Sequence, residues 1–374
     1  MRRVRLKEIG TFYSGLSGKS KSDFSEGNAL LVTYRNIFNN PVLNPAIKDT
    51  VVVGKDEKQN EVLWGDILIT GSSETPADAG MSSVVLFNPQ EKMYLNSFCF
   101  GFRLNDMNEA LPSYIGHLLR STSIRAAISK TAFGVTRFNV NRMRFADIEI
   151  PLPPLNIQKE IVSILDSFTS LIDKMKQEVE MRKKQMEYYR EKLMAPQKNW
   201  EIKTLGEIGT FTRGNGLQKS DFRVKGFPCV HYGQIHTYYN TCIYKTKSFC
   251  EEDLAKKLQK ASYGDLLIAT TSEDVKACCK AAVWFGAGDV AYSGDSFCYS
   301  HDQDPKYMAY LFQTEMFAKQ KQKAATGAKV IRVSGESMAS FSFAFPPLVQ
   351  QRQIASILDT FETYISKLEK MIEL

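Results

Sequence analysis

Near its start the chain reads Leu6-Lys7-Glu8-Ile9-Gly10-Thr11-Phe12, and in its second half it reads Leu205-Gly206-Glu207-Ile208-Gly209-Thr210-Phe211. Other stretches recur in the same order; Gly65-Asp66-Ile67-Leu68-Ile69, for example, returns as Gly264-Asp265-Leu266-Leu267-Ile268. Each copy is long enough to hold its own hydrophobic core, unlike the short units of a solenoid. We therefore predict two similar globular modules on one chain.

Length and composition fit two ordinary soluble domains. The 374 residues are 43% hydrophobic and 24% charged, which is close to the globular average. The net charge of +7 and the pI near 8.8 are compatible with a polyanionic partner without requiring one. No apolar run of about 18 residues occurs, and no apolar stretch follows the basic start Met1-Arg2-Arg3-Val4-Arg5. We expect no membrane association and a cytoplasmic location.

The seven cysteines have no disulfide-framework spacing, which favours a reducing compartment. One group contains the atom types that bind zinc, but its spacings match no known clip and its neighbours are typical of strands. We therefore expect no metal, although a metal-dependent DNA-acting enzyme stays open as an alternative. The residues of this group are Cys229, His231, His236, Cys242 and Cys250.

Each half combines predicted strands with predicted helices. Up to about residue 104, short apolar runs such as Leu30-Leu31-Val32 are separated by Gly, Asn, Pro and Ser, which indicates strands. Residues 111–130 and 307–323 then have helical spacing of apolar residues. A glycine-containing loop follows in each copy, at 132–137 and at 325–329.

A proline-rich stop comes next in both halves, Pro151-Leu152-Pro153-Pro154-Leu155 and Pro346-Pro347-Leu348, and a long helix follows each one. Apolar residues recur there in steps of four and three among Lys, Glu, Asp and Gln, which is typical of a coiled-coil seam. From Ile161 to Leu193 the first helix would span roughly 48 Å. Because this helix leads away from the first module and the second leads back, we expect an antiparallel pair that acts as a spacer.

The predicted fold class is α+β, with two similar mixed α/β modules separated by a long antiparallel two-helix coiled coil. The predicted boundaries are 1–150 for the first module, 151–198 for the first helix, 199–345 for the second module and 346–374 for the second helix. The predicted seam residues are Ile161, Leu165, Phe168, Ile172, Met175 and Val179 in the first helix, and Ile354, Leu358, Phe361, Ile365 and Leu368 in the second.

Catalytic motifs are not found. Gly15-Leu16-Ser17-Gly18-Lys19-Ser20 has two residues between its glycines where a phosphate-binding loop has four. Trp284-Phe285-Gly286-Ala287-Gly288 faintly resembles a methyltransferase cofactor loop, but the equivalent stretch of the first copy is Leu86-Phe87-Asn88-Pro89, so a hairpin turn explains both. With four histidines, and no paired carboxylates that repeat, the sequence predicts a non-catalytic protein.

Several of these features together resemble the specificity (S) subunit of type I restriction-modification systems. They are the opening Trp200-Glu201-Ile202-Lys203-Thr204-Leu205-Gly206-Glu207-Ile208, the Gly65-Asp66-Ile67-Leu68-Ile69 strand, the Gly134-Val135-Thr136-Arg137 loop, and Pro151-Leu152-Pro153-Pro154-Leu155-Asn156-Ile157-Gln158-Lys159-Glu160-Ile161 leading into the long helix. Each is weak alone, but they occur in order and twice. The resemblance covers essentially the whole chain.

The resemblance implies that each module is a target recognition domain for one half of a split sequence in double-stranded DNA. It also implies that two DNA methyltransferase (M) subunits dock on the helices, and that restriction and translocation (R) subunits join them. S-adenosylmethionine, ATP and Mg would be bound by those partners, which methylate adenine at N6, and no cofactor by this chain. Two departures are that the second helix stops at Leu374, shorter than the first, and that the first module begins almost at Met1. Either would weaken one methyltransferase contact or mark a compact family member. A coiled-coil scaffold remains another alternative.

Candidate DNA-binding residues follow from the chemistry of base and phosphate recognition. Arg and Lys bind guanine, Asn and Gln bind adenine, and Ser and Thr support phosphate contacts. The candidates in the first module are Lys19, Lys21, Arg35, Asn36, Ser72, Ser73, Arg137, Asn139 and Arg142. Those in the second are Lys219, His231, Tyr232, Gln234, Thr271, Ser272, Lys329 and Arg332.

Overall fold

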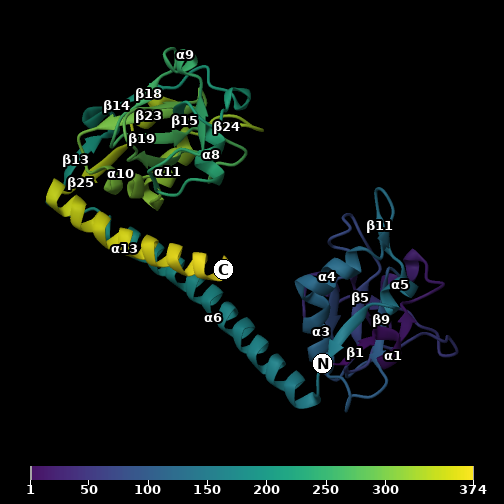
Figure 1. Ribbon diagram of the computed structural model, residues 1–374. Helices are drawn as coiled ribbons and strands as arrows, with labels where there is room; N and C mark the ends of the chain where they lie inside the picture. The colour runs from purple at the N-terminus through teal and green to yellow at the C-terminus, as the bar shows by residue number, and fades with distance from the viewer. Residues whose placement is uncertain (1, 374) are drawn as a thin grey trace. The chain divides into compact units, whose positions relative to one another are not determined.

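The computed structural model describes residues 2–373, and the chain divides into two compact units, Met1–Ile172 and Asp173–Leu374 (Figure 1). The division falls within one continuous helix. Each unit has its own hydrophobic cores, and we describe the two separately.

Unit 1 combines small sheets with short helices before the long helix begins. Its elements are β1 (Arg2–Arg5), α1 (Leu6–Ile9), β2 (Gly10–Ser14), η1 (Lys21–Phe24), β3 (Ala29–Val32), α2 (Tyr34–Asn39), β4 (Thr50–Val51), β5 (Ile67–Thr70), β6 (Ser72–Ser73), β7 (Ser82–Val84), β8 (Met93–Leu95), β9 (Cys99–Leu104), α3 (Pro112–Arg120), α4 (Thr122–Ser129), β10 (Ala132–Phe133), β11 (Phe138–Val140), α5 (Arg142–Ala146), β12 (Glu149–Leu152) and α6 (Leu155–Leu193).

The central sheet of unit 1 has the antiparallel order β2-β9-β5-β7 and is covered on both faces. Ile67 and Ile69 of β5 pack in one core with Ile115 of α3, whereas Leu68 packs in another core with Ile37 of α2. Alternate residues of a strand point to opposite faces, so a continuous apolar run here means a strand buried on both sides. Smaller sheets β4-β3-β8 and β10-β11-β6 lie beside it.

Unit 2 repeats this plan. Its elements are β13 (Glu201–Thr204), α7 (Leu205–Ile208), β14 (Gly209–Arg213), η2 (Lys219–Asp221), β15 (Phe227–Val230), α8 (Tyr232–Thr237), β16 (Cys242–Ile243), β17 (Ser248–Cys250), α9 (Glu252–Ala255), β18 (Lys260–Ala261), β19 (Leu266–Ala269), β20 (Thr271–Ser272), β21 (Lys280–Trp284), β22 (Val290–Tyr292), β23 (Ser296–His301), α10 (Pro305–Leu311), α11 (Glu315–Ala324), β24 (Ile331–Arg332), α12 (Gly335–Ala339), β25 (Ser342–Phe345) and α13 (Leu348–Glu373).

The central sheet of unit 2 has the order β14-β23-β19-β21-β16, which matches the order in unit 1 with β16 added at the edge. Here too the central strand is buried on both faces, because Leu266 and Ile268 join one core while Leu267 and Ala269 join another. The terminal pair β13-β25 has the same antiparallel arrangement as β1-β12. The predicted α+β class and the duplicated module are confirmed.

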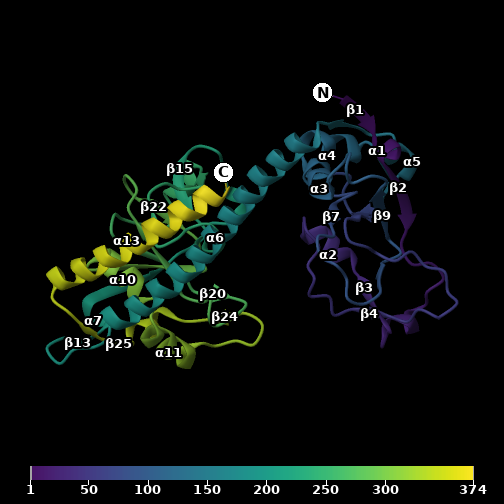
Figure 2. The same cartoon turned by 90° about the horizontal axis from the view of Figure 1, so that it is seen from below.

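Within unit 2, the last part of α6 and α13 lie side by side and run in opposite directions (Figure 2). Lys183 forms an ion pair of 2.9 Å with Glu369, and the ring of Tyr189 stacks on that of Phe361 with centroids 5.5 Å apart. Residue numbers rise along one helix while those of its partner fall. The predicted antiparallel helix pair is therefore confirmed for this segment.

The predicted seam residues lie in the helix pair, in the core of a module or on the exposed part of α6. Val179 and Ile365 are buried, and Met175, Phe361 and Leu368 are partly buried. Ile354 and Leu358 are also buried, but they belong to the main core of unit 2, so α13 is packed on the module as well as on α6.

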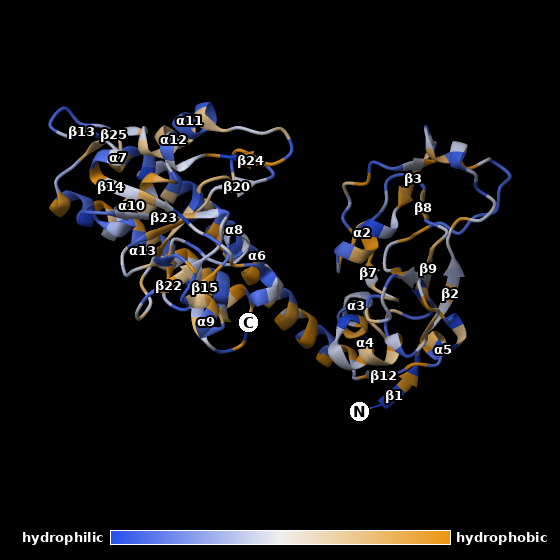
Figure 3. Cartoon of the chain, turned by 90° about the horizontal axis from the view of Figure 1, so that it is seen from above, coloured by the Kyte–Doolittle hydropathy of each residue, from blue (hydrophilic) through white to orange (hydrophobic). Residues whose placement is uncertain are grey.

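In the part of α6 that belongs to unit 1, Ile161 is half-buried against the module core. The seam then comes to the surface at Leu165, Phe168 and Ile172, with Phe168 58% exposed. Hydrophobic and hydrophilic residues alternate along the helix (Figure 3).

One buried glutamine attaches each module to its long helix. The side chain of Gln158 accepts a hydrogen bond from the amide of Leu111 and donates to the carbonyls of Pro153 and Glu109. Gln351 repeats the arrangement in unit 2, accepting from the amide of Asp304 and donating to the carbonyl of Pro346. The proline stop that marks a helix start in the sequence is thus also an anchoring point. Among residues 2–373, no helix is long and apolar enough to cross a membrane.

Candidate nucleic-acid interface

In unit 1 a small hairpin lies beside a cleft that is lined by polar and aromatic residues. Strands β10 and β11 form the hairpin, and β11 also pairs with β6. Gly134 has a φ of 132°, and a side chain there would collide with the carbonyl oxygen of Arg137, so the tight turn requires glycine. The cleft has a volume of about 640 Å³, and its lining includes Tyr34, Phe38, Ser72, Ser73, Asn96, Phe98, Thr136 and Arg137.

Arg137 is one of the residues that line this cleft, and it is exposed. Its Nε donates a hydrogen bond of 3.0 Å to Ser72 Oγ, and its guanidinium lies 4.9 Å from the centroid of the Phe98 ring. Phe98 is 57% exposed, and the rings of Tyr34 and Phe38 stack with their centroids 5.7 Å apart. Exposed aromatic faces next to a fixed cation are suited to stacking on bases and holding phosphates. Three predicted residues, Ser72, Ser73 and Arg137, are therefore brought together.

Asn139 and Arg142 follow Arg137 along the chain and occupy different surroundings. Asn139 pairs with Ser72 across the ladder and is exposed. Arg142 begins helix α5, donates a hydrogen bond to Ser14 and lies 5.0 Å from the centroid of the Phe100 ring. The guanidinium of Arg142 is thus held against the module.

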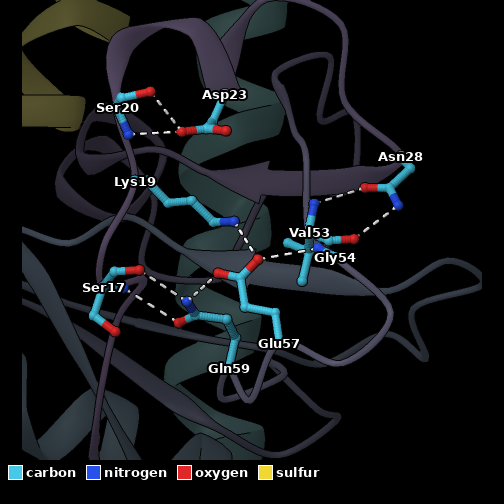
Figure 4. A network of polar contacts seen from close by, with 9 residues as sticks. All are labelled: Ser17, Lys19, Ser20, Asp23, Asn28, Val53, Gly54, Glu57 and Gln59. Carbon is cyan, nitrogen blue, oxygen red and sulfur yellow. Dashed lines mark hydrogen bonds and ion pairs between the residues drawn. The ribbon is translucent and has the colours of Figure 1, made fainter.

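The first predicted lysine, Lys19, forms an ion pair inside the module. Lys19 is almost completely buried and forms an ion pair with Glu57, which also accepts hydrogen bonds from Gly54 and Gln59 (Figure 4). The Lys19 ammonium, the Gln59 amide and the Gly54 backbone together lower the pKa of Glu57 to about 2. Lys21, two residues on, is exposed at the start of η1 and forms no ion pair among residues 2–373.

The two residues of helix α2 that were predicted to contact DNA differ in the same way. Arg35 is exposed. The side chain of Asn36 donates to the carbonyl of Asn44 and accepts hydrogen bonds from the Asn44 amide and the Asn40 side chain. Asn36 therefore shapes the loop after α2, and its amide is occupied within the module.

In unit 2, strands β20 and β24 form the counterpart of the β6-β11 ladder. Thr271 pairs with Arg332 and Ser272 with Ile331. The Thr271 hydroxyl donates to Asp295, and the Thr271 carbonyl is 3.0 Å from Nε2 of His236. Ser272 is half-buried, and Arg332 is exposed.

This register corrects one equivalence. The sequence predicts that Arg137 and Lys329 occupy equivalent positions after a glycine turn. Phe138 pairs with Ser73 as Ile331 pairs with Ser272, so Val330 is the counterpart of Arg137 and Lys329 is that of Thr136. The glycine turns agree with the ladder, because Gly134 and Gly327 lie three residues before Arg137 and Val330, whereas Lys329 is only two residues after Gly327. Lys329 is exposed next to Gly327, which has a φ of 100°.

A second cleft in unit 2, of about 500 Å³, contains two more predicted residues. His231 and Tyr232 line it together with Arg213, Gln218 and Asp295. His231 is buried, its Nδ1 accepts a hydrogen bond from the Gly233 amide, and burial lowers its pKa.

The remaining predicted residues of unit 2 are one occupied amide and one exposed lysine. The Gln234 amide donates to Ser248 Oγ, and its carbonyl accepts from the His231 amide, so its side chain is occupied, like that of Asn36. Lys219 is exposed in η2.

Sequence reasoning missed the aromatic part of these sites. Phe98 appears in the sequence only as a member of the repeated Ser97-Phe98-Cys99 stretch and was not among the predicted DNA-binding residues. Strand β9 begins one residue later, so Phe98 lies on the loop and faces the cleft. Phe38 and Asp295 were also missed. Sequence spacing carried no signal for them, because each is a single residue at an element end.

Within the cysteine and histidine group of unit 2, Cys229 and Cys250 pack together in one small core. Among residues 2–373, no three His, Cys, Asp or Glu side chains are placed to hold a metal ion. Burial is the main reason that the pKa of Cys229 is raised to about 12 and that of Cys242 to about 11, which keeps both thiols protonated.

Comparison with known families shows which family the chain belongs to. The model of the type I restriction modification DNA specificity domain matches residues 1–181 and again residues 197–374. The chain belongs to this family. Its membership confirms the resemblance to S subunits and the prediction of a non-catalytic subunit.

Curated relatives and solved structures agree with this membership. A putative type I restriction enzyme specificity subunit of Haemophilus influenzae is 28% identical over 64% of this chain and 63% of its own length. The EcoR124I/EcoR124II specificity subunit of Escherichia coli is 25% identical over 58% of this chain and 55% of its own length. The chain thus spans less than two thirds of the length of these relatives.

Two solved structures share the fold over the whole chain. One comes from work on complex assembly and conformational transition of the type I R-M system, with a TM-score of 0.65, 16% identity and coverage of 100% of this chain and 92% of that one. The S subunit from M. genitalium has a TM-score of 0.53 and 15% identity at the same coverage.

Proposed function

We propose that this chain is the DNA-reading subunit of a type I restriction-modification complex and that each module recognises one half of a bipartite target. We assign residues 1–150 and 199–345 to the two recognition modules. The observation that carries the proposal is the duplicated ladder, β6-β11 and β20-β24, whose exposed residues differ between the copies. A common frame with different side chains suits two different half-sites.

We assign phosphate and base contacts to the candidates according to whether each side chain is exposed or already bonded within its module. Exposed Lys21, Arg35, Lys219 and Lys329 are suited to bind phosphates as point charges. Arg137, fixed by Ser72 and Phe98, is suited to hold a phosphate or a base at the cleft entrance. The occupied side chains of Lys19, Asn36 and Gln234 position loops instead.

Methyltransferase subunits are proposed to dock on the long helices. Besides the seam, α13 carries Ile357, Tyr364 and Met371, spaced seven residues apart and exposed by 43%, 44% and 61%. Met181 and Tyr188 of α6 are seven residues apart and exposed by 59% and 60%. An apolar stripe that repeats every seven residues on the outside of a helix pair suits further helices of a partner.

Catalysis and cofactors are assigned to the partners. In this proposal the methyltransferase subunits bind S-adenosylmethionine and methylate adenine at N6, and the restriction subunits use ATP and Mg. The complex acts on double-stranded DNA in the cytoplasm. The seam residues Leu165, Phe168 and Ile172, exposed on the first part of α6, would be covered in the assembly.

The experiment is to coexpress the chain with the methyltransferase subunit of its own system and map methylated adenines in the host genome. We expect one split motif with two defined halves and an unread gap. If a variant that lacks residues 199–345 still directs methylation, its motif should keep the first half-site and lose the second. Methylation without sequence preference, or methylation by the purified chain alone, would overturn the proposal.

A further inference from the structure

One pair of positions is equivalent in the two modules by strand register. Asn139 lies opposite Ser72, and Arg332 lies opposite Thr271. The residue after each one, Val140 at the end of β11 or Val333 just beyond β24, is buried in the main core of its unit. Because neighbouring residues of a strand point to opposite faces, the buried Val140 turns Asn139 away from the core. Arg332 is exposed on its own ladder.

Both side chains are exposed and unoccupied. Across residues 2–373, neither the Asn139 amide nor the Arg332 guanidinium takes part in a hydrogen bond or ion pair within the chain. The other equivalent pair of amide-bearing positions, Asn36 and Gln234, is fully engaged inside the modules. A base contact through two hydrogen bonds requires both polar atoms of the side chain to be free.

The ladder also presents these residues rigidly. Ser72 and Thr271, their strand partners, are 4% and 8% exposed; the Ser72 hydroxyl accepts a hydrogen bond from Arg137 of the hairpin, and the Thr271 hydroxyl donates one to Asp295. Residues opposite one another in antiparallel strands lie on the same face. Asn139 therefore shares a face with Ser72, beside the cleft that contains Arg137 and Phe98.

The residue types match the base code of the major groove. An asparagine amide pairs with N6 and N7 of adenine, and an arginine guanidinium pairs with O6 and N7 of guanine. We propose that Asn139 reads an adenine in the first half-site and that Arg332 reads a guanine at the corresponding place in the second. This inference rests on the proposed function and names the residues that make the two half-sites differ.

The test exchanges the two residues in the assembled methyltransferase. The variants are Asn139→Arg and Arg332→Asn, with Asn139→Gln as the conservative partner, since glutamine makes the same contact with adenine. Asn108→Arg is the matched control, because Asn108 is exposed in the loop beyond the far end of β9, away from the hairpin. Methylated adenines are mapped for each complex, and circular dichroism checks the fold.

We expect Asn139→Arg to change one adenine of the first half-site to guanine and Arg332→Asn to change one guanine of the second half-site to adenine. Preference for the original base should fall roughly 5- to 150-fold at that position alone. Asn139→Gln and Asn108→Arg should keep the original motif.

Several results would count against the inference. An unchanged motif in either exchange variant, or a change in the other half-site, overturns it. If Asn139→Arg abolishes methylation, Asn139→Ala decides: tolerance of any base at one position supports the assignment, and a retained adenine overturns it. A wild-type complex that methylates no defined motif would instead contradict the proposed function.

Discussion

The side-chain oxygen of Gln158 accepts a hydrogen bond from the backbone amide of Leu111 at 2.9 Å, and this contact ties the start of α6 to the loop before α3. Gln351 and Asp304 form the same contact at 3.0 Å in unit 2. Both glutamines are buried, with exposed fractions of 0% and 1%. Each is therefore part of the core of its own module.

Alanine at either glutamine should destabilise one unit and spare the other. Gln158→Ala leaves the Leu111 amide without its partner, which costs about 1 to 3 kcal/mol. Hydrogen exchange followed by mass spectrometry should show faster exchange in residues 1–172 for Gln158→Ala and in residues 173–374 for Gln351→Ala. Gln177→Ala, at an exposed position of α6, is the control and should change neither. Equal effects on both units would refute the assignment of one anchor to each module.

Arg137→Ala should weaken DNA binding by the assembled methyltransferase and reduce the salt dependence of its affinity. Lys329→Ala should lower the salt slope by about 1 if Lys329 binds one phosphate. Arg137 should cost more, because it also fills the space between Ser72 and Phe98. Titrations at several salt concentrations check both variants, and an unchanged slope would remove the residue from the interface.

Alanine at Lys19 should affect the stability of unit 1, whereas alanine at Lys21 should affect DNA binding. Lys19→Ala removes the partner that holds Glu57 and should lower the thermal stability of unit 1. Lys21→Ala should leave that stability unchanged and weaken DNA binding, because its ammonium is exposed. Thermal unfolding and DNA titration of the same two proteins make the comparison. The reverse pattern would show that the buried pair opens to bind DNA.

Unit 2 should lose stability as the pH falls below about 6.5. Burial lowers the pKa of His301, and of His231, below the usual 6.5. The unfolded chain then binds protons that the folded chain does not, so stability present above pH 6.5 is lost as the pH decreases. Hydrogen exchange of unit 2 at pH 7.5 and 5.5, expressed as protection relative to the intrinsic exchange rate at each pH, measures this loss. His301→Asn keeps an acceptor for the Gln303 amide and should flatten the dependence; an identical pH profile would show that His301 is not responsible.

Lengthening α6 should widen the unread gap of the target. Seven residues inserted in register after Met175 add about 10 Å of helix, which corresponds to up to about three base pairs. Met175 precedes the part of α6 that pairs with α13, so that pair should remain intact. Methylation mapping would then show the same half-sites further apart. An unaltered gap with full activity would mean that the helix does not set the distance.

The sequence was sufficient for the parts of the molecule that depend on periodicity. The repeat predicted two modules, and the apolar steps of four and three predicted the helix pair that Tyr189 and Phe361 form. It did not reveal that Lys19, Asn36 and Gln234 are occupied, because their partners Glu57, Asn44 and Ser248 are brought to them by the tertiary fold. The alignment of Val330 with Arg137 was available from the turn glycines, since Gly134 and Gly327 each precede these residues by three, but the prediction that paired Arg137 with Lys329 did not use it.

The glutamine anchors have a consequence for how such a molecule changes over time. Gln158 and Gln351 hold their modules mainly through backbone amides and carbonyls, and none of those contacts involves a residue of the hairpin ladders. Substitutions at Asn139 or Arg332 therefore leave the attachment intact. Substitutions that alter base recognition can therefore accumulate at the hairpins while the contacts that join each module to its helix stay constant.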